Sequence, residues 1–452
     1  MERCIKKSKS DVLESAYDPE IRMFAINLHF YSAKAYNYVR SILHDALPCE
    51  RTLRLWTNKI LSTPGFCERS FFLLKMKKEE MEAESKGKLI VSLILDEMHL
   101  KKHLHFDGEK IVGGIDLGQE YDGNCAKTEA SEVLVFMVNA INMKFKIPVA
   151  YFFINGLSAQ IKSSLLTTCI TKLINIGIEV SNVTFDGPSV HLSMAKQMGA
   201  ILDPDNLDPR IGLKLNKPLL PCLFDPPHMI KLIRNALGSL TYLKKGSKII
   251  SWIYFEKLYQ LQTQTGIHLA NKLSRAHIEW ESKKMTVKYA TQLFSESVAK
   301  ALDYCREVLK LPEFEHSEAT SEFCRIMDRI FNIMNSSNPN LTSDSKAAFT
   351  AENKASILKT FDETALYIRN LKTPKEIRII DDRKKTGFLG ILSNIEALKL
   401  VYLNLIDSDL LKFIPTRKLN QDPLGMTFKI VRKMHIHHCL KLTYLCKPTP
   451  EG

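Results

Sequence analysis

Paired cysteines, long apolar runs and phosphate-binding loops are all missing from this sequence of 452 residues. The ten cysteines are scattered and form no CxxC pair, which argues against a zinc ribbon or a disulfide framework and favours reduced thiols. No apolar segment follows the N-terminal residues, and no run of about 18 uncharged apolar residues occurs later, so neither a signal peptide nor a membrane span is predicted. No GxxxxGKS/T motif occurs, so the residues alone predict no P-loop.

The composition is that of a globular protein with an excess of basic residues. Hydrophobic residues make up 45% and charged residues 25% of the chain, and the formal net charge is +13. The length suggests about three domains. Excess Lys and Arg favours polyanionic partners, so nucleic acid, and DNA in particular, is the expected partner. Reduced thiols fit a nuclear protein, and the nucleus is the expected location. A homo-oligomer is a candidate assembly, and no membrane is expected to be involved.

The N-terminal segment shows the pattern of short helices around a turn. Apolar residues recur at helical spacing from Tyr17 to Val39, and a turn at Pro48 leads into a second helical stretch that carries Arg51, Arg54 and Lys59. This arrangement suits a helix-turn-helix; a small helical bundle with solvated basic residues is the alternative.

The next part of the chain alternates between strand and helix patterns. The expected order is three strands of an antiparallel meander (89–95, 103–106 and 110–117), a helix (131–145), a strand (149–154), a helix (158–177) and a strand (180–185). That order is typical of an RNase H-like fold, in which the first and fourth strands lie side by side at the sheet centre. Farther along, strand patterns fade and helical periodicity dominates.

We therefore predict an α/β protein in which an N-terminal helix-turn-helix precedes an RNase H-like domain interrupted by an all-helical insertion. The predicted segments are 1–75 (helix-turn-helix), 76–87 (charged linker), 88–236 (RNase H-like, first part), 237–385 (helical insertion), 386–428 (RNase H-like, return segment) and 429–452 (divergent basic tail).

Two aspartates stand where predicted strands end. Asp96 closes the first predicted strand, and Asp186 closes the strand 180–185, which is expected to lie near it, so both are expected at one edge of the sheet. Carboxylate pairs of this kind hold Mg²⁺ or Mn²⁺ in two-metal phosphoryl transfer. The alternative is that each is a turn residue, as Asp before Gly often is. Glu97 is expected to point to the opposite face, because consecutive strand residues do so.

Several segments together resemble the P-element transposases and their THAP-type vertebrate relatives. They are LILDEMHLKK, VTFDGPSVHLSMAKQMGA, LFDPPHMIKLIRNAL, KLSRAHIEWESKKMTVKYATQLFSESVAKAL and TGFLGIL. The resemblance extends from about Tyr17 to Phe428. It implies that Asp96 and Asp186 are catalytic, metal-binding members of an acidic triad. It also implies that the insertion binds GTP as a cofactor, with Asp225, Lys231 and Asp422 at the cofactor site. Alternatively, Asp225 caps the helix after Pro226.

The chain departs from the family pattern at three places. The family's zinc-binding THAP domain and coiled coil do not precede the resemblance, which implies a truncated N-terminus. The third acidic residue is replaced by Gly425 in LNQDPLGMTF, and Pro423 is expected to disfavour the helix there. Glu396 could substitute, although a solvated helical face is the simpler interpretation. The tail clusters His435, His437, His438 and Cys439 in a spacing that matches no standard zinc pattern.

Three functional hypotheses follow from these observations. The first is a transposase-like nuclear protein that retains DNA binding, and GTP binding by resemblance, but cleaves DNA poorly because Gly425 cannot bind metal. The second is an active cut-and-paste transposase that uses another third carboxylate. The third is a non-catalytic protein-interaction scaffold, whose affinity for DNA would be absent or insensitive to salt.

Overall fold

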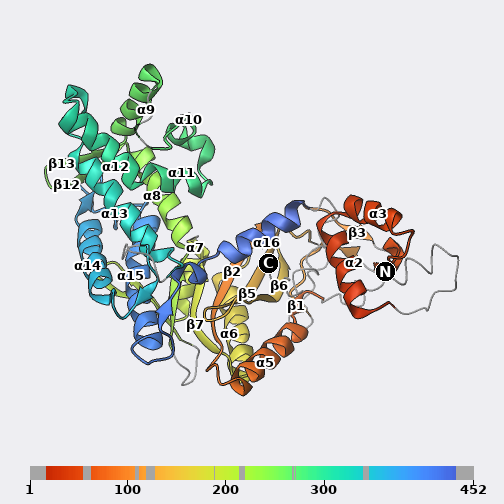
Figure 1. The fold of residues 1–452 in the computed structure, drawn as a ribbon. Helices are drawn as coiled ribbons and strands as arrows, with labels where there is room; N and C mark the ends of the chain where they lie inside the picture. The colour runs from red at the N-terminus through yellow and green to blue at the C-terminus, as the bar shows by residue number, and fades with distance from the viewer. Residues whose placement is uncertain are drawn as a thin grey trace.

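The fold is organised around a seven-stranded mixed sheet (Figure 1). This computed structural model describes residues 17–53, 63–106, 111–118, 128–187, 189–212, 219–266, 269, 271–338 and 346–433. The strand order is β1-β6-β5-β2-β7-β11-β10. The bounds are β1 Gly65–Phe66, β2 Ile90–His99, β5 Glu132–Ala140, β6 Lys146–Ile154, β7 Glu179–Phe185, β10 Arg210–Ile211 and β11 Leu220–Phe224.

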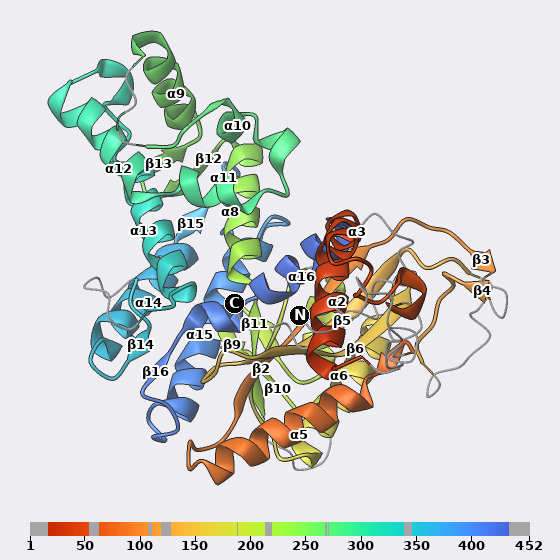
Figure 2. The ribbon, with the colours of Figure 1, turned by 45° about the vertical axis from the view of Figure 1, so that its right-hand side comes forward.

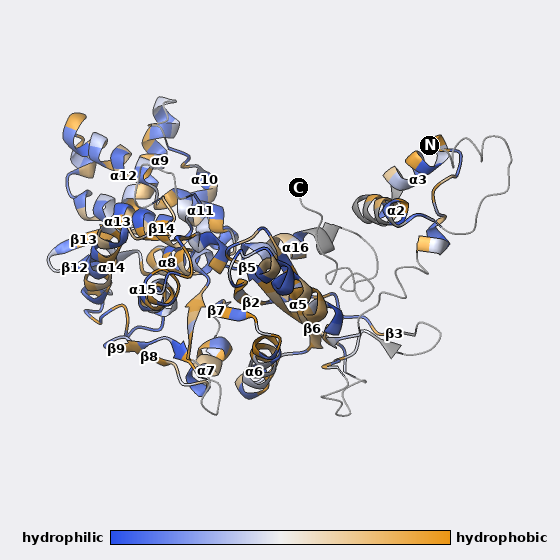
Figure 3. Cartoon of the chain, turned by 60° about the horizontal axis from the view of Figure 1, so that its bottom comes forward, coloured by the Kyte–Doolittle hydropathy of each residue, from blue (hydrophilic) through white to orange (hydrophobic). Residues whose placement is uncertain are grey.

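The first and fourth core strands are neighbours at the centre of the sheet, which is the order expected of an RNase H-like fold. β2 pairs antiparallel with β5, and β5 with β6, while β2 pairs parallel with β7 and β7 with β11. The strands are apolar on both faces because helices cover both. Figure 3 shows the hydrophobic character of β7 and of the helices α8 (Pro226–Leu240) and α15 (Thr386–Leu405).

The helix predicted for residues 131–145 was wrong. Residues 131–145, expected as a helix, contain strand β5, which with β2 and β6 forms the meander. The segments expected as its second and third strands instead contribute β3 (His105–Phe106) and β4 (Ile111–Val112), a separate small hairpin. Nearly every side chain of β5 is buried, so the strand lacks the alternation of apolar and polar residues that identifies a half-buried strand. A continuous apolar run of this kind fits a buried helix equally well.

Helices cover the two faces of the sheet. α5 (Glu68–Ala83) and α6 (Ala159–Asn175) pack on one face, and α16 (Asp422–Lys433) packs on the other through Leu424 and Phe428 (Figure 2). Residues 76–83, expected as a linker, belong to α5. Ion pairs such as Lys77–Glu80 and Lys78–Glu82 lie along this charged stretch at helical spacing.

The N-terminal helices have a small core of their own. α2 (Pro19–Tyr31) and α3 (Ala33–Ile42) meet at Ser32, whose hydroxyl caps α3, and Ala25, Tyr36, Leu47 and Leu53 are buried together. A further helical stretch begins at residue 50. Arg54 and Lys59, expected on the second helix, lie outside the described residues, as does the predicted histidine and cysteine cluster of the tail.

The insertion is mainly helical, but it also includes a small antiparallel sheet of β13, β12 and β15. α8 leads from the main sheet into it (Figure 2). Its elements are β12 Tyr242–Lys245, β13 Lys248–Ser251, α9 Ile253–Thr265, α10 Arg275–Ile278, the 3₁₀ helix η2 Trp280–Lys283, α11 Val287–Leu293, α12 Glu296–Asp303, the π-helix η3 Tyr304–Val308, the 3₁₀ helix η4 Pro312–Phe314, α13 Glu318–Met334, α14 Lys354–Arg369 and β15 Leu371–Lys372.

The remaining short elements connect these parts. They are α7 Ser189–Gln197, the hairpin β8 Ile201–Asp203 with β9 Asn206–Asp208, the pair β14 Phe349–Thr350 with β16 Phe413–Ile414, and the 3₁₀ helix η5 Thr416–Leu419. α15 is long and apolar enough to cross a membrane by length and composition, but 72% of its most apolar window is buried inside the fold. α15 is therefore a helix of the main hydrophobic core.

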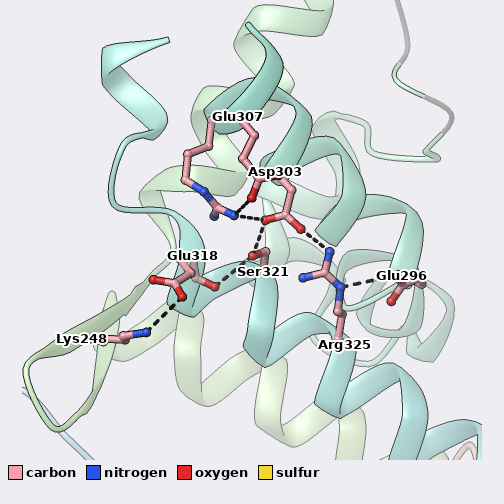
Figure 4. Close-up of polar contacts among 8 residues, drawn as sticks. Lys248, Glu296, Asp303, Glu307, Glu318, Ser321 and Arg325 are labelled. Carbon is pink, nitrogen blue, oxygen red and sulfur yellow. Dashed lines mark hydrogen bonds and ion pairs between the residues drawn. The ribbon is translucent and has the colours of Figure 1, made fainter. Parts of the chain in front are cut away.

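Asp303, at the end of α12, holds α12 and α13 together (Figure 4). It accepts hydrogen bonds from Ser321 and Arg306, both at 2.7 Å, and from Arg325. Burial alone would raise the pKa of Asp303, but the bonds from Arg325 and Ser321 outweigh burial and lower the pKa below its ordinary value. The charged carboxylate therefore stabilises the folded insertion.

We predict that Asp303→Asn lowers the free energy of unfolding by about 1–3 kcal/mol at pH 7, because hydrogen bonds to a charged group are lost. Since the folded-state pKa is depressed, the stabilisation is present above the unfolded-state pKa of about 4 and is lost as the pH falls through the folded-state value. Denaturant unfolding at several pH values should show the difference between parent and variant shrinking below about pH 4. Glu307→Gln, at an exposed partner of Arg306, is the control and should change stability by less than about 1 kcal/mol; equal effects of the two would contradict the assignment.

Candidate active site at the edge of the parallel strands

Three aspartates lie at the ends of three neighbouring parallel strands. Ile94 of β2 is level with Thr184 of β7, and Phe185 is level with Phe224 of β11. Counting on along the strands places Asp96, Asp186 and Asp225 at one level, because parallel strands run in register. We call these three residues the carboxylate edge. Asp96 and Asp186 are the two that the strand pattern predicted.

Asp96 lies on the face of β2 that α16 covers. Ile94 and Met98, two residues before and after it, pack with Leu424 and Phe428 of α16. The pKa of Asp96 is raised well above its ordinary value, foremost by burial and next by the negative charge of Asp186, with a further contribution from Asp225. Burial and the two neighbouring carboxylates therefore disfavour the charged form of Asp96, and a bound cation would favour it.

The pKa of Asp186, in contrast, lies below its ordinary value. Burial alone would raise its pKa, but a hydrogen bond to His191 and the charges of nearby basic groups outweigh burial and lower it. The Nδ1 atom of His191 lies 2.6 Å from the Oδ1 atom of Asp186. Asp186 is therefore held as a carboxylate, the form that binds metal.

Asp225 caps helix α8, as the alternative interpretation predicted. Its two oxygens accept hydrogen bonds from the backbone N–H of His228 at 3.1 Å and of Gln421 at 2.8 Å. Burial is the main cause that raises its pKa. Asp225 thereby joins β11, the start of α8 and the segment before α16.

The residues assigned to a cofactor by resemblance gather near the same edge. Lys231, on α8, is 5% exposed; burial lowers its pKa, while the charges of Asp186, Asp225 and Asp96 oppose that effect. Asp422 begins α16 and pairs with Arg417 at 3.1 Å. The structure thus brings Asp225, Lys231 and Asp422 together with the carboxylate edge, and their role in binding a nucleotide stays a prediction.

Gly425, which the resemblance aligns with the third acidic residue, lies in a well-formed helix. The expectation that Pro423 would disturb this helix was wrong, because α16 begins at Asp422 and proline is tolerated in a first turn. Gln421 fixes the helix start by donating from Nε2 to the backbone oxygen of Leu95 at 2.6 Å. A Cβ atom built at Gly425 meets nothing within 4 Å. The backbone is in place and only the side chain is missing.

The donor set fits one divalent cation better than two. Asp96 and Asp186 offer the hard oxygen ligands that Mg²⁺ and Mn²⁺ prefer, and their excess negative charge would be relieved by a cation. Within the described ranges, no group of three or more His, Cys, Asp or Glu side chains is arranged to hold a metal ion. Glu396, considered as a substitute, pairs instead with Lys399 at 3.2 Å.

Three residues near the site were missed by sequence reasoning. His191 lies five residues after Asp186 in the same quoted segment, near the start of α7, and that nearness in sequence could have identified it. Gln421 adjoins Asp422, but an amide that binds backbone groups has no sequence signal. Lys162 lies on a helix whose pattern suggests only packing and solvation, so its burial could not be foreseen.

Family models match three parts of the chain. Residues 1–56 match a transposable element P transposase-like HTH domain, residues 62–199 a TNP-like RNase H N-terminal domain, and residues 227–348 a TNP-like GTP-binding insertion domain. Together these matches cover more than half of the sequence. They confirm the predicted fold class and the family resemblance.

Relatives agree with this assignment. The chain is 31% identical over 425 residues to human DNA transposase THAP9, covering 92% of this chain and 46% of that protein. It is 29% identical over 210 residues to the Drosophila melanogaster transposable element P transposase, covering 46% of this chain and 27% of that protein. The chain thus spans about half the length, or less, of these relatives.

A solved structure titled Drosophila P element transposase strand transfer complex shares the fold. It superposes with a TM-score of 0.78 at 20% identity, covering 99% of this chain and 94% of that one. This likeness shows the fold, and the three family models together with the relatives show that the chain belongs to the P-element transposase family.

Proposed function

We propose that this chain is a P-element and THAP-type transposase-like protein that binds DNA in the nucleus and has lost efficient strand cleavage. One observation carries the proposal: Asp96 and Asp186 are level at the carboxylate edge, while Gly425 leaves the third ligand position of α16 without a side chain. The net charge of +13 supports DNA as the partner. GTP is the proposed cofactor of the insertion, supported by the family match of residues 227–348.

Asp96 and Asp186 would hold the metal, and the protein supplies their placement. A divalent cation bound there would activate an attacking oxygen and neutralise charge on a DNA phosphate. Asp225 and Gln421 keep the start of α16 against β2 and β11. Losing one catalytic carboxylate commonly costs a factor of about 10² to 10³ in rate, so residual cleavage would be slow.

A second candidate, an active transposase, is favoured by the position of Asp225. It is level with Asp186 and lies close enough to raise the pKa of Asp96, so it could act as the third carboxylate. Against this role, both of its oxygens already accept backbone hydrogen bonds. The cleavage experiment below separates the two candidates.

We predict that the protein binds terminal-repeat DNA with an affinity that falls steeply as salt rises, but leaves the DNA intact in Mg²⁺ and GTP. Binding would be followed by fluorescence anisotropy at several salt concentrations, and nicking by gel electrophoresis. The slope of log affinity against log salt should be about −0.9 for each phosphate neutralised. Binding that is absent or insensitive to salt would support an interaction scaffold instead.

Robust nicking that Asp96→Asn abolishes would contradict the proposal and favour the active transposase. Asp225→Asn then tests the third carboxylate, because asparagine removes the charge and keeps one of the two acceptor oxygens, which can still cap α8. If Asp225 binds metal, this variant should lose nicking about as fully as Asp96→Asn. If it only caps α8, nicking should stay near that of the parent.

We further predict that Gly425→Glu strengthens Mn²⁺ binding by about tenfold or more, because it adds a carboxylate, in open space, to the helix that covers the Asp96 face of β2. Gly425→Gln is the matched control: both variants remove the helix penalty of glycine, about 1 kcal/mol, but only glutamate adds charge. Mn²⁺ titration by electron paramagnetic resonance measures the affinity. Equal affinities of the two variants would show that position 425 does not face the metal.

A further inference from the structure

A chain of four polar side chains runs beneath the carboxylate edge and ends at Asp186. The Oε1 atom of Glu97 lies 2.5 Å from the Nζ atom of Lys162, which lies 3.2 Å from Nε2 of His191. Nδ1 of His191 lies 2.6 Å from Oδ1 of Asp186. The residues come from β2, α6, α7 and the end of β7, so the fold itself brings them together.

The donors and acceptors along this chain fix the state of His191. The ammonium group of Lys162 can only donate, so Nε2 of His191 must accept from it. The proton of the neutral ring is then on Nδ1, which donates to Asp186. The bond fixes one oxygen of Asp186 and thereby sets the direction of the other.

Lys162 and His191 are both buried, so each depends on its protein partners for hydrogen bonds. Lys162 is 4% exposed and His191 1% exposed, so neither can exchange its partner for water without cost. Glu97 balances the buried ammonium from the strand that also carries Asp96. The consecutive residues Asp96 and Glu97 therefore both act on Asp186: Asp96 through repulsion between the carboxylates, Glu97 through Lys162 and His191.

We propose that Glu97, Lys162 and His191 form a positioning relay that orients Asp186 as a ligand for a divalent cation. The inference rests on the metal site of the proposed function and deepens it. The relay does not touch DNA or metal; it acts through Asp186. A merely structural role would hold α6 and α7 to the sheet without affecting the metal.

The experiment measures Mn²⁺ affinity of the full chain by electron paramagnetic resonance, together with thermal unfolding. His191→Leu removes the donor to Asp186 and should weaken Mn²⁺ binding by about 10- to 100-fold, the usual effect of losing a group that orients a ligand. His191→Asn keeps an N–H near the position of Nδ1 and should recover most of the affinity. Glu363→Gln, at an exposed ion pair with Lys359 on α14, should leave the affinity unchanged.

If His191→Leu fails to fold, the double variant Glu97→Gln/Lys162→Met provides the test. It removes both charges of the pair together, so no buried charge is left unpaired. We expect it to weaken Mn²⁺ binding measurably, because His191 is no longer held from Nε2. Unfolding temperatures separate a loss of stability from a loss of affinity.

The outcomes distinguish the relay from the site it serves. If the parent binds Mn²⁺ and the folded variants bind it equally well, the relay is overturned while the metal site stands. If the parent binds no Mn²⁺, the metal site of the proposed function is overturned, and the relay with it. Weaker binding in His191→Leu, recovered in His191→Asn, supports both.

Discussion

Repulsion between buried carboxylates is the constraint on which the site depends. Parallel pairing of β2, β7 and β11 forces Asp96, Asp186 and Asp225 to one level, and burial strengthens their interaction. Each aspartate is stabilised differently. Asp186 has His191, Asp225 has two backbone N–H groups, and Asp96 keeps a strongly raised pKa. The least compensated carboxylate is the one for which a bound cation would matter most.

The segment before α16 couples this edge to the distant end of the chain. Gln421 bonds to Asp225 and to the backbone of Leu95, and the hydroxyl of Thr184 donates to the backbone oxygen of Leu419. Residues 419–421 thus contact β2, β7 and the end of β11. These bonds fix the position at which the chain comes back to the sheet after the insertion. The long insertion between α8 and α15 therefore need not position α16 itself.

Sequence patterns predicted the two aspartates at the strand ends better than the side chains that surround them. Asp96 and Asp186 could be predicted because strand ends align at a sheet edge. Strand β5 could not be identified as a strand, because burial on both faces removes the alternation that distinguishes strands from helices. Lys162 and His191 come together only through tertiary packing of α6 and α7, which no local spacing records. The effect of Pro423 depends on whether it lies in the first turn of a helix, where proline is tolerated, or farther along. It lies in the first turn of α16, and the sequence did not show where that helix begins.

On the proposed function, the absence of a side chain at position 425 acts through charge and ligand number rather than through shape, because the backbone there is a regular helix. Burial and the neighbouring carboxylates raise the pKa of Asp96, and the charges of all three carboxylates act on the pKa of Lys231. A divalent cation at the edge would favour the charged form of Asp96. A second cation would need a further carboxylate, and glycine cannot supply it. Asp186 is already oriented by His191, and α16 is already anchored by Gln421. On the proposed function, the edge keeps two of three metal-binding carboxylates in place, and the capacity for strand cleavage would depend on the third.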